Sequence, residues 1–206
     1  MKEKTKNLKS KKKWYIATGM VLLLLMLLFL WLFNRDKGIS TPTMTIKTPQ
    51  KVSIQETKEL LLDVTISTLG DTIYPAASMS ISFDPSRLEF IGIEEGNVFV
   101  RGGESGVPRK LPEWSCNPTQ CNKTGKINIM YLDTTGGKNA FSQELLAQED
   151  NVVLRLKFRL RGSVRNGDVC DLIFEDAIFA ASDETKSLAM TQKNLKVRNS
   201  KIVVGE

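Results

Sequence analysis

Three stretches of this chain alternate apolar and polar residues with a period of two, and this pattern constrains the fold more than any other feature. The clearest stretch is NVVLRLKFRLR (151–161), and ELLLDVTIS (59–67) and ASMSISF (77–83) follow the same rule. In the first stretch the polar set consists of Arg155, Lys157, Arg159 and Arg161. Successive strand residues point to opposite faces of a sheet, so each stretch predicts a strand with one buried face in an antiparallel sheet.

Weaker strand candidates occupy much of the remaining chain. They are RLEFIGI (87–93), KINIMYL (126–132), VCDLIF (169–174), DAIFAA (176–181) and KIVV (201–204). One or two helical turns are expected in 139–150, and the run 96–125 is long enough to predict a functional or mobile loop. Many short strands with hardly any helix predict an all-β fold in which two sheets pack face to face, as in a β-sandwich or jelly roll.

The N-terminal segment differs from the rest of the chain in charge and hydropathy. Residues 1–13 contain seven lysines and one glutamate, which accounts for the whole net charge of +6. Residues 14–33 (WYIATGMVLLLLMLLFLWLF) contain no charged residue and are long enough to cross a bilayer as a helix. Because lysine flanks stay in the cytoplasm, we predict a basic cytoplasmic tail (1–13), a transmembrane anchor (14–33), a linker (34–46) and an extracellular domain (47–206). A cleaved signal peptide is the alternative for the apolar run.

Several classes of function are disfavoured by what the sequence lacks. Outside residues 1–13 the acidic and basic residues balance, so a nucleic-acid-binding face is not expected. The chain has no histidine, and no nucleophile or phosphate-loop motif occurs, so we predict neither an enzyme nor a metal or cofactor site. In an extracellular domain Cys116 and Cys121 could form a disulfide, whereas Cys170 is expected to pack as a small apolar residue.

The four cationic residues of the 151–161 stretch have two interpretations. They could bind an acidic partner such as an anionic cell-wall polymer. They could instead be the solvated face of a strand, where charge prevents association between sheet edges. The second interpretation is favoured.

The stretch SMSISFDPSRLEFIGIEEG (78–96) raises the question of why one strand exposes only serines. Here the sequence resembles the cohesin family, through MSISFDPSRLEFIGIEEGNVF and, more weakly, through ELLLDVTIS, KINIMYLDTTGG, EDNVVLRLKFRLRG, LIFEDAIFAASDE and NSKIVVGE. The resemblance implies a nine-stranded jelly-roll β-sandwich, here preceded by the N-terminal transmembrane helix. It also implies binding rather than catalysis: one flat sheet face captures a dockerin, a small helical module that carries its own calcium.

The same resemblance places candidate partner-binding residues on two neighbouring strands. They are Ala76, Ser78, Ser80, Ser82, Tyr131 and Thr134, and the small hydroxyl side chains would let a helix approach closely. The best-known members carry an Asn-x-Asp pair where this chain has Ala76 and Ser78, so their polar contacts are missing here. The partner therefore differs, or the fold serves another use.

Three functions remain open at this point. The first is a membrane-anchored, cohesin-like module that displays a dockerin-bearing or other protein, such as a polysaccharide-degrading enzyme, at the cell surface. The second is a carbohydrate-binding module, for which Trp114 and Tyr74 are the candidate exposed rings. The third is a structural subunit of a cell-envelope assembly.

Overall fold

The computed structural model describes residues 20, 22–24, 26, 41–55, 59–102, 109–147, 149–182 and 189–205. The chain divides into two compact units, residues 1–40 and 41–206. In the first unit the described residues are helical, and none of the helices in the described part of the chain has the length and apolarity needed to cross a membrane. The predicted tail (1–13) and most of the predicted anchor (14–33) lie outside the described residues.

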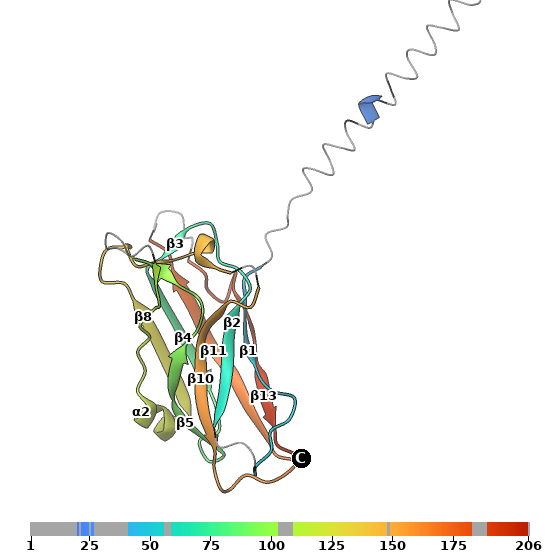
Figure 1. Ribbon diagram of the computed structural model, residues 1–206, viewed down its shortest axis with the longest axis vertical. Helices are drawn as coiled ribbons and strands as arrows, with labels where there is room; N and C mark the ends of the chain where they lie inside the picture. Colours follow the sequence, from blue (N-terminus) through green and yellow to red (C-terminus); the bar gives the residue numbers. More distant parts are fainter. Residues whose placement is uncertain are drawn as a thin grey trace, which may run out of the picture. The chain divides into compact units, whose positions relative to one another are not determined.

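The second unit contains two main sheets that form the layers seen in Figure 1. The five-stranded sheet is antiparallel except where its first two strands pair in parallel. In spatial order it consists of β12 (Lys196–Arg198), β1 (Thr43–Lys47), β2 (Leu60–Ile66), β10 (Val152–Leu160) and β5 (Leu88–Glu95). The antiparallel four-stranded sheet consists of β13 (Ser200–Val203), β11 (Val169–Ala180), β4 (Ala76–Ser82) and β8 (Lys126–Leu132).

Short elements close the ends of the sandwich. Two small sheets pair β3 (Ile73–Tyr74) with β9 (Phe141–Ser142) and β6 (Val100–Arg101) with β7 (Arg109–Lys110). The helical elements of this unit are η1 (Gln143–Leu145) and α2 (Pro118–Thr124).

The core lies between the inner faces of the two main sheets, as the period-two pattern requires. In β10 the alternate residues Leu154, Leu156 and Phe158 are fully buried, and in β4 Met79 and Ile81 are buried in the same way. An aromatic contact joins the two layers, since the Phe158 ring packs edge-on against that of Phe83, which follows β4 in the other sheet; Phe158 also packs edge-on against Phe90 on the neighbouring strand β5. The all-β sandwich predicted from the sequence is thereby confirmed.

The structure corrects three boundaries. The stretch Thr43–Lys47, most of which was assigned to the linker 34–46, forms β1, because Met44 and Ile46 are buried and the strand pairs with β2. The two predicted strands 169–174 and 176–181 are one strand, β11, with an irregularity between Phe174 and Asp176. The predicted loop 96–125 contains β6, β7 and α2.

Helix α2 was not predicted, although its end signals are present in the sequence. The Asn117 side chain accepts a hydrogen bond from the Gln120 backbone N–H, Pro118 occupies the first turn, and Gly125 ends the helix with a φ of 70°. The helix also protects the free edge of β5. The Asn122 side chain accepts a hydrogen bond from the Phe90 N–H (2.8 Å) and donates one to the Phe90 carbonyl oxygen (2.7 Å).

Candidate functional site

The outer surface of the four-stranded sheet, called here the β4 face, is the strongest candidate for a functional site. It consists of the side chains that alternate with the buried ones on three neighbouring strands. They are Ala76, Ser78, Ser80 and Ser82 from β4; Lys126, Asn128, Met130 and Leu132 from β8; and Ile173, Glu175, Asp176, Ile178 and Ala180 from β11.

Small side chains form the centre of this face. Strand β4 lies between β8 and β11, so that Ser78 is opposite Met130 on one side and Ile178 on the other. The Ser80 hydroxyl donates to Asn128 Oδ1 at 2.7 Å. Because alanine and serine protrude little from the pleat, a rigid element such as a helix can approach this strand closely.

Exposed apolar side chains lie beside the serines. Met130 is 54% exposed, Leu132 60% and Ile173 42%. Large exposed apolar side chains that lie together on one surface are typical of protein interaction sites. The β4 face therefore combines a central strand of small side chains with exposed apolar side chains on the neighbouring strands β8 and β11.

Two of the charges on this face neutralise one another, while the Asp176 carboxylate, opposite Ser80, accepts hydrogen bonds from the Ala177 N–H (2.9 Å) and the Gln192 amide (3.4 Å). Lys126 Nζ lies 2.7 Å from Glu175 Oε2, and the Gln192 amide donates to the Glu175 carbonyl oxygen at 3.0 Å. Ala76 and the three serines of β4 carry no charge. The face therefore offers mainly apolar and hydrogen-bonding contacts along β4 and β8, with one carboxylate at its β11 side.

A hollow of about 470 Å³, called here the β8 hollow, lies on the β4 face. Its lining is Ser78, Met79, Ser80, Ser115, Cys116, Asn128, Ile129 and Met130. Ser115 is held at the edge of β8 by two backbone hydrogen bonds with Met130. Burial, and to a lesser degree the proximity of Cys121, raises the pKa of the Cys116 thiol. The hollow is thus lined by hydroxyl, amide, thioether and neutral thiol groups.

The sequence-predicted partner-binding residues do not all lie on this face. Ala76, Ser78, Ser80 and Ser82 do, and Thr134 is exposed in the turn that follows β8. The placement of Tyr131 was wrong, because its side chain is buried on the inner face, where its hydroxyl donates to the Asn139 carbonyl oxygen. Tyr131 shares its parity with the buried Ile127 and Ile129, and its outward neighbours are Met130 and Leu132.

The cysteines are free thiols in this structure, so the disulfide suggested between Cys116 and Cys121 is not formed. Cys121 lies in α2 with 3% of its surface exposed, and Cys116, which precedes the helix, packs partly against the core and lines the β8 hollow. Cys170 is buried at 1% exposure, and burial raises the pKa of its thiol, consistent with its predicted packing role.

The opposite outer surface, on the five-stranded sheet, has a different character. The three cationic residues of β10 are paired with acids from neighbouring chain segments: Arg155 with Asp63 (3.0 Å), Lys157 with Glu59 (2.9 Å) and Glu94 (3.2 Å), and Arg159 with Glu59 and Glu89 (3.4 Å each). The hydrogen bonds that Lys157 donates to Glu59 and Glu94 raise its pKa. The solvated-strand interpretation therefore describes this surface better than an anion-binding one.

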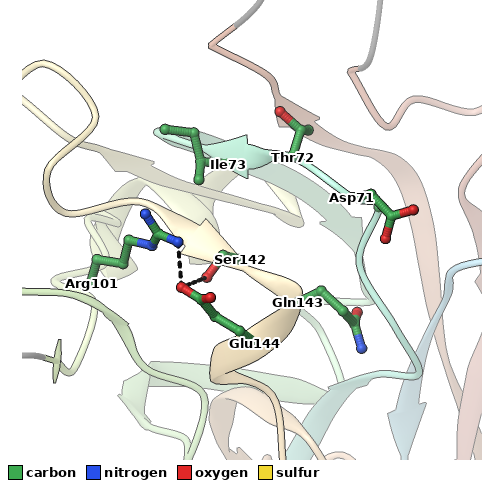
Figure 2. Close-up of a pocket in the computed structure, with 8 residues that line it drawn as sticks. Asp71, Thr72, Ile73, Arg101, Ser142, Gln143 and Glu144 are labelled. Carbon is green, nitrogen blue, oxygen red and sulfur yellow. Dashed lines mark hydrogen bonds and ion pairs between the residues drawn. The ribbon is translucent and has the colours of Figure 1, made fainter.

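A second hollow, of about 390 Å³, lies beside β3, β9 and η1 (Figure 2). Arg101 forms an ion pair with Glu144, and the Ser142 hydroxyl lies 3.5 Å from the same carboxylate. Asp71 and Thr72 point away from this pair (Figure 2). The Arg101 and Glu144 charges therefore neutralise one another, and Asp71 is not part of the pair. Among the described residues, no group of three or more histidine, cysteine or carboxylate side chains could hold a metal ion.

The two aromatic candidates for carbohydrate binding are structural. Tyr74 is 1% exposed and packs edge-on against Phe179. Trp114 is half-buried, and its ring packs against those of Tyr131 and Phe141 at centroid distances of 5.8 and 5.7 Å. Neither ring belongs to a flat exposed row on which a sugar could stack, so the expectation that they are exposed was wrong.

Comparisons with known proteins agree on one family. The model of the family described as "Cohesin domain" matches residues 43–198. The sixth cohesin of scaffoldin B from Acetivibrio cellulolyticus, solved in complex with a dockerin, is 18% identical with a TM-score of 0.56, and the match covers 80% of this chain and 99% of that one. No curated protein sequence matches this chain.

Two further solved structures extend the likeness. A cohesin solved in a type I cohesin–dockerin complex from Clostridium thermocellum has the same identity, coverage and TM-score. A non-cellulosomal cohesin from the archaeon Archaeoglobus fulgidus is 11% identical with a TM-score of 0.50, and the match covers 81% of this chain and 93% of that one. At these identities the structures show a shared fold.

Proposed function

This chain belongs to the cohesin domain family, and we propose that it is a non-catalytic receptor whose β4 face binds a dockerin-type module of another protein. Cohesins of the same fold were solved in complex with dockerins, which supports a partner of that class. The family resemblance of the Ser78–Gly96 region is thereby confirmed.

One observation carries this proposal: the two outer surfaces of the sandwich differ in what they leave available. On the five-stranded sheet the cationic side chains of β10 already form ion pairs with acidic residues of neighbouring segments. On the β4 face the central side chains are small, while Met130 and Leu132 are largely exposed. The centre of a protein interface is typically depleted of charge and closely packed, which suits the β4 face.

The chemistry of the β4 face also supports a partner that differs from the best-studied dockerins. The best-known cohesins carry an Asn-x-Asp pair at the positions that Ala76 and Ser78 occupy in this chain. Alanine and serine cannot form an ion pair with a cationic side chain of the partner. We place the main contact area over Met130 and Leu132 instead, beside the serines of β4.

The proposal includes attachment to a membrane. The apolar run 14–33 is long enough to span a bilayer and follows seven lysines, which supports a single-pass anchor with the cohesin domain outside the cell. The segment between this run and β1 is short, so the domain would hold its partner close to the cell surface.

An affinity capture tests the function. Residues 41–206, which form a compact unit with their own core, serve as bait for secreted and surface proteins, with and without a calcium chelator. We expect chelator-sensitive capture of a dockerin-bearing protein, since calcium belongs to the dockerin. Recovery of a stable envelope complex that survives chelation, without any dockerin, would refute the proposal and support the structural-subunit alternative.

A further inference from the structure

Resting on the proposed function, we propose that the partner's docking helix seats one uncharged side chain in the β8 hollow, and that docking at this site is therefore insensitive to salt. The hollow lies on the β4 face between the serines of β4 and the Ser115–Cys116 segment at the edge of β8. The hollow has a volume of about 470 Å³, so a side chain that projects from a helix lying along the sheet could enter it.

The lining excludes a charged side chain. None of its residues is acidic or basic, and the Cys116 thiol is neutral at neutral pH because burial raises its pKa. Of the charged groups nearby, Lys126 and Glu175 neutralise each other, and the Asp176 carboxylate lies across β4 from the hollow, where it accepts hydrogen bonds from the Ala177 N–H and the Gln192 amide. Moving an ion out of water without a counter-charge costs several kcal/mol, so a partner that brought one here would bind poorly.

The lining also provides hydrogen-bond donors. The Ser80 hydroxyl donates to Asn128 Oδ1, which fixes the orientation of the Asn128 amide. In the described part of the chain, the amide N–H groups of Asn128 and the hydroxyl of Ser78 have no partner. An uncharged side chain that carries an acceptor atom would satisfy these donors, while its carbon atoms pack against Met130.

The cysteine at the rim allows a direct test. Cys116 is partly exposed, whereas Cys121 and Cys170 are at most 3% exposed, so N-ethylmaleimide should modify Cys116 alone in the folded protein. The probes are the dockerins from the Acetivibrio cellulolyticus and Clostridium thermocellum complexes, together with any dockerin recovered by capture. A bound dockerin should slow alkylation by about tenfold or more. Alkylation before mixing should weaken binding by a similar factor, and a Cys116→Ser control should keep its affinity after the same treatment.

Charge is tested separately. Ser80→Asp should weaken binding by about tenfold or more, and Leu61→Asp on the opposite surface should leave it unchanged. Affinity of the unmodified protein should change less than about threefold between about 0.05 and 0.5 M salt. A dockerin that binds while Cys116 alkylates at its free rate, or that tolerates Ser80→Asp, overturns this inference and leaves the proposed function standing. Failure of every dockerin to bind overturns both.

Discussion

Replacing Met130 and Leu132 together by serine should weaken dockerin binding by about 30-fold. Complete burial of a methionine or leucine side chain is worth about 1.5–3 kcal/mol. Met130 and Leu132 are 54% and 60% exposed, so roughly half of that value remains for a partner to gain at each residue. The two residues together then contribute about 2 kcal/mol, which corresponds to about 30-fold in the dissociation constant.

Isothermal titration calorimetry on residues 41–206 measures this change. Leu61→Ser is the matched control, because Leu61 is 47% exposed on the five-stranded sheet and lies away from the β4 face. Urea unfolding checks that the double variant remains folded. If the double variant binds as tightly as the parent, or if the Leu61 variant loses as much affinity, the partner does not dock on the β4 face and the reasoning fails.

Three further predictions concern the scaffold. Asn122→Ala should lower the free energy of unfolding by about 2–4 kcal/mol in urea titrations, because it strips both backbone groups of Phe90 of their partner; no change would mean that water replaces the amide. Gly125→Ala should lower the melting temperature, since φ is 70° and a Cβ would lie 2.9 Å from a backbone oxygen; an unchanged melting temperature would contradict this. Hydrogen bonds from the Ser86 hydroxyl and N–H lower the pKa of Asp84, so its contribution to stability is present above the unfolded pKa and is lost as pH falls through the folded pKa. Asp84→Asn should therefore lose less stability than the parent between about pH 6 and pH 2.5, and an equal loss would contradict the assignment.

The strands that could be predicted from the sequence are those in which burial alternates with polarity. In β10 and β4 one set of residues is apolar and buried, so local pattern and tertiary structure agree. The same rule would have placed Tyr131 correctly, because it shares its parity with Ile127 and Ile129. That error came from transferring a position by family resemblance, where a shift of one residue reverses the face.

Other features escaped prediction because they depend on contacts between distant residues. Strand β1 has only two buried side chains, Met44 and Ile46, and is held in place by its neighbours in the sheet. Helix α2 buries only Cys121, which gives no apolar periodicity to detect. The sequence shows that β10 exposes cations, but only the folded sheet shows that acids from β2, β5 and Glu59 neutralise them.

The amide of Asn122 has a consequence beyond the stability of one molecule. A strand at the border of a sheet normally offers its backbone as a template to any passing chain, which is how fibres begin. On the border formed by β5, the groups of Phe90 are already occupied. At high local concentration, copies of this domain can therefore present the β4 face to partners while the Phe90 position of β5 is protected from pairing with a strand of another copy.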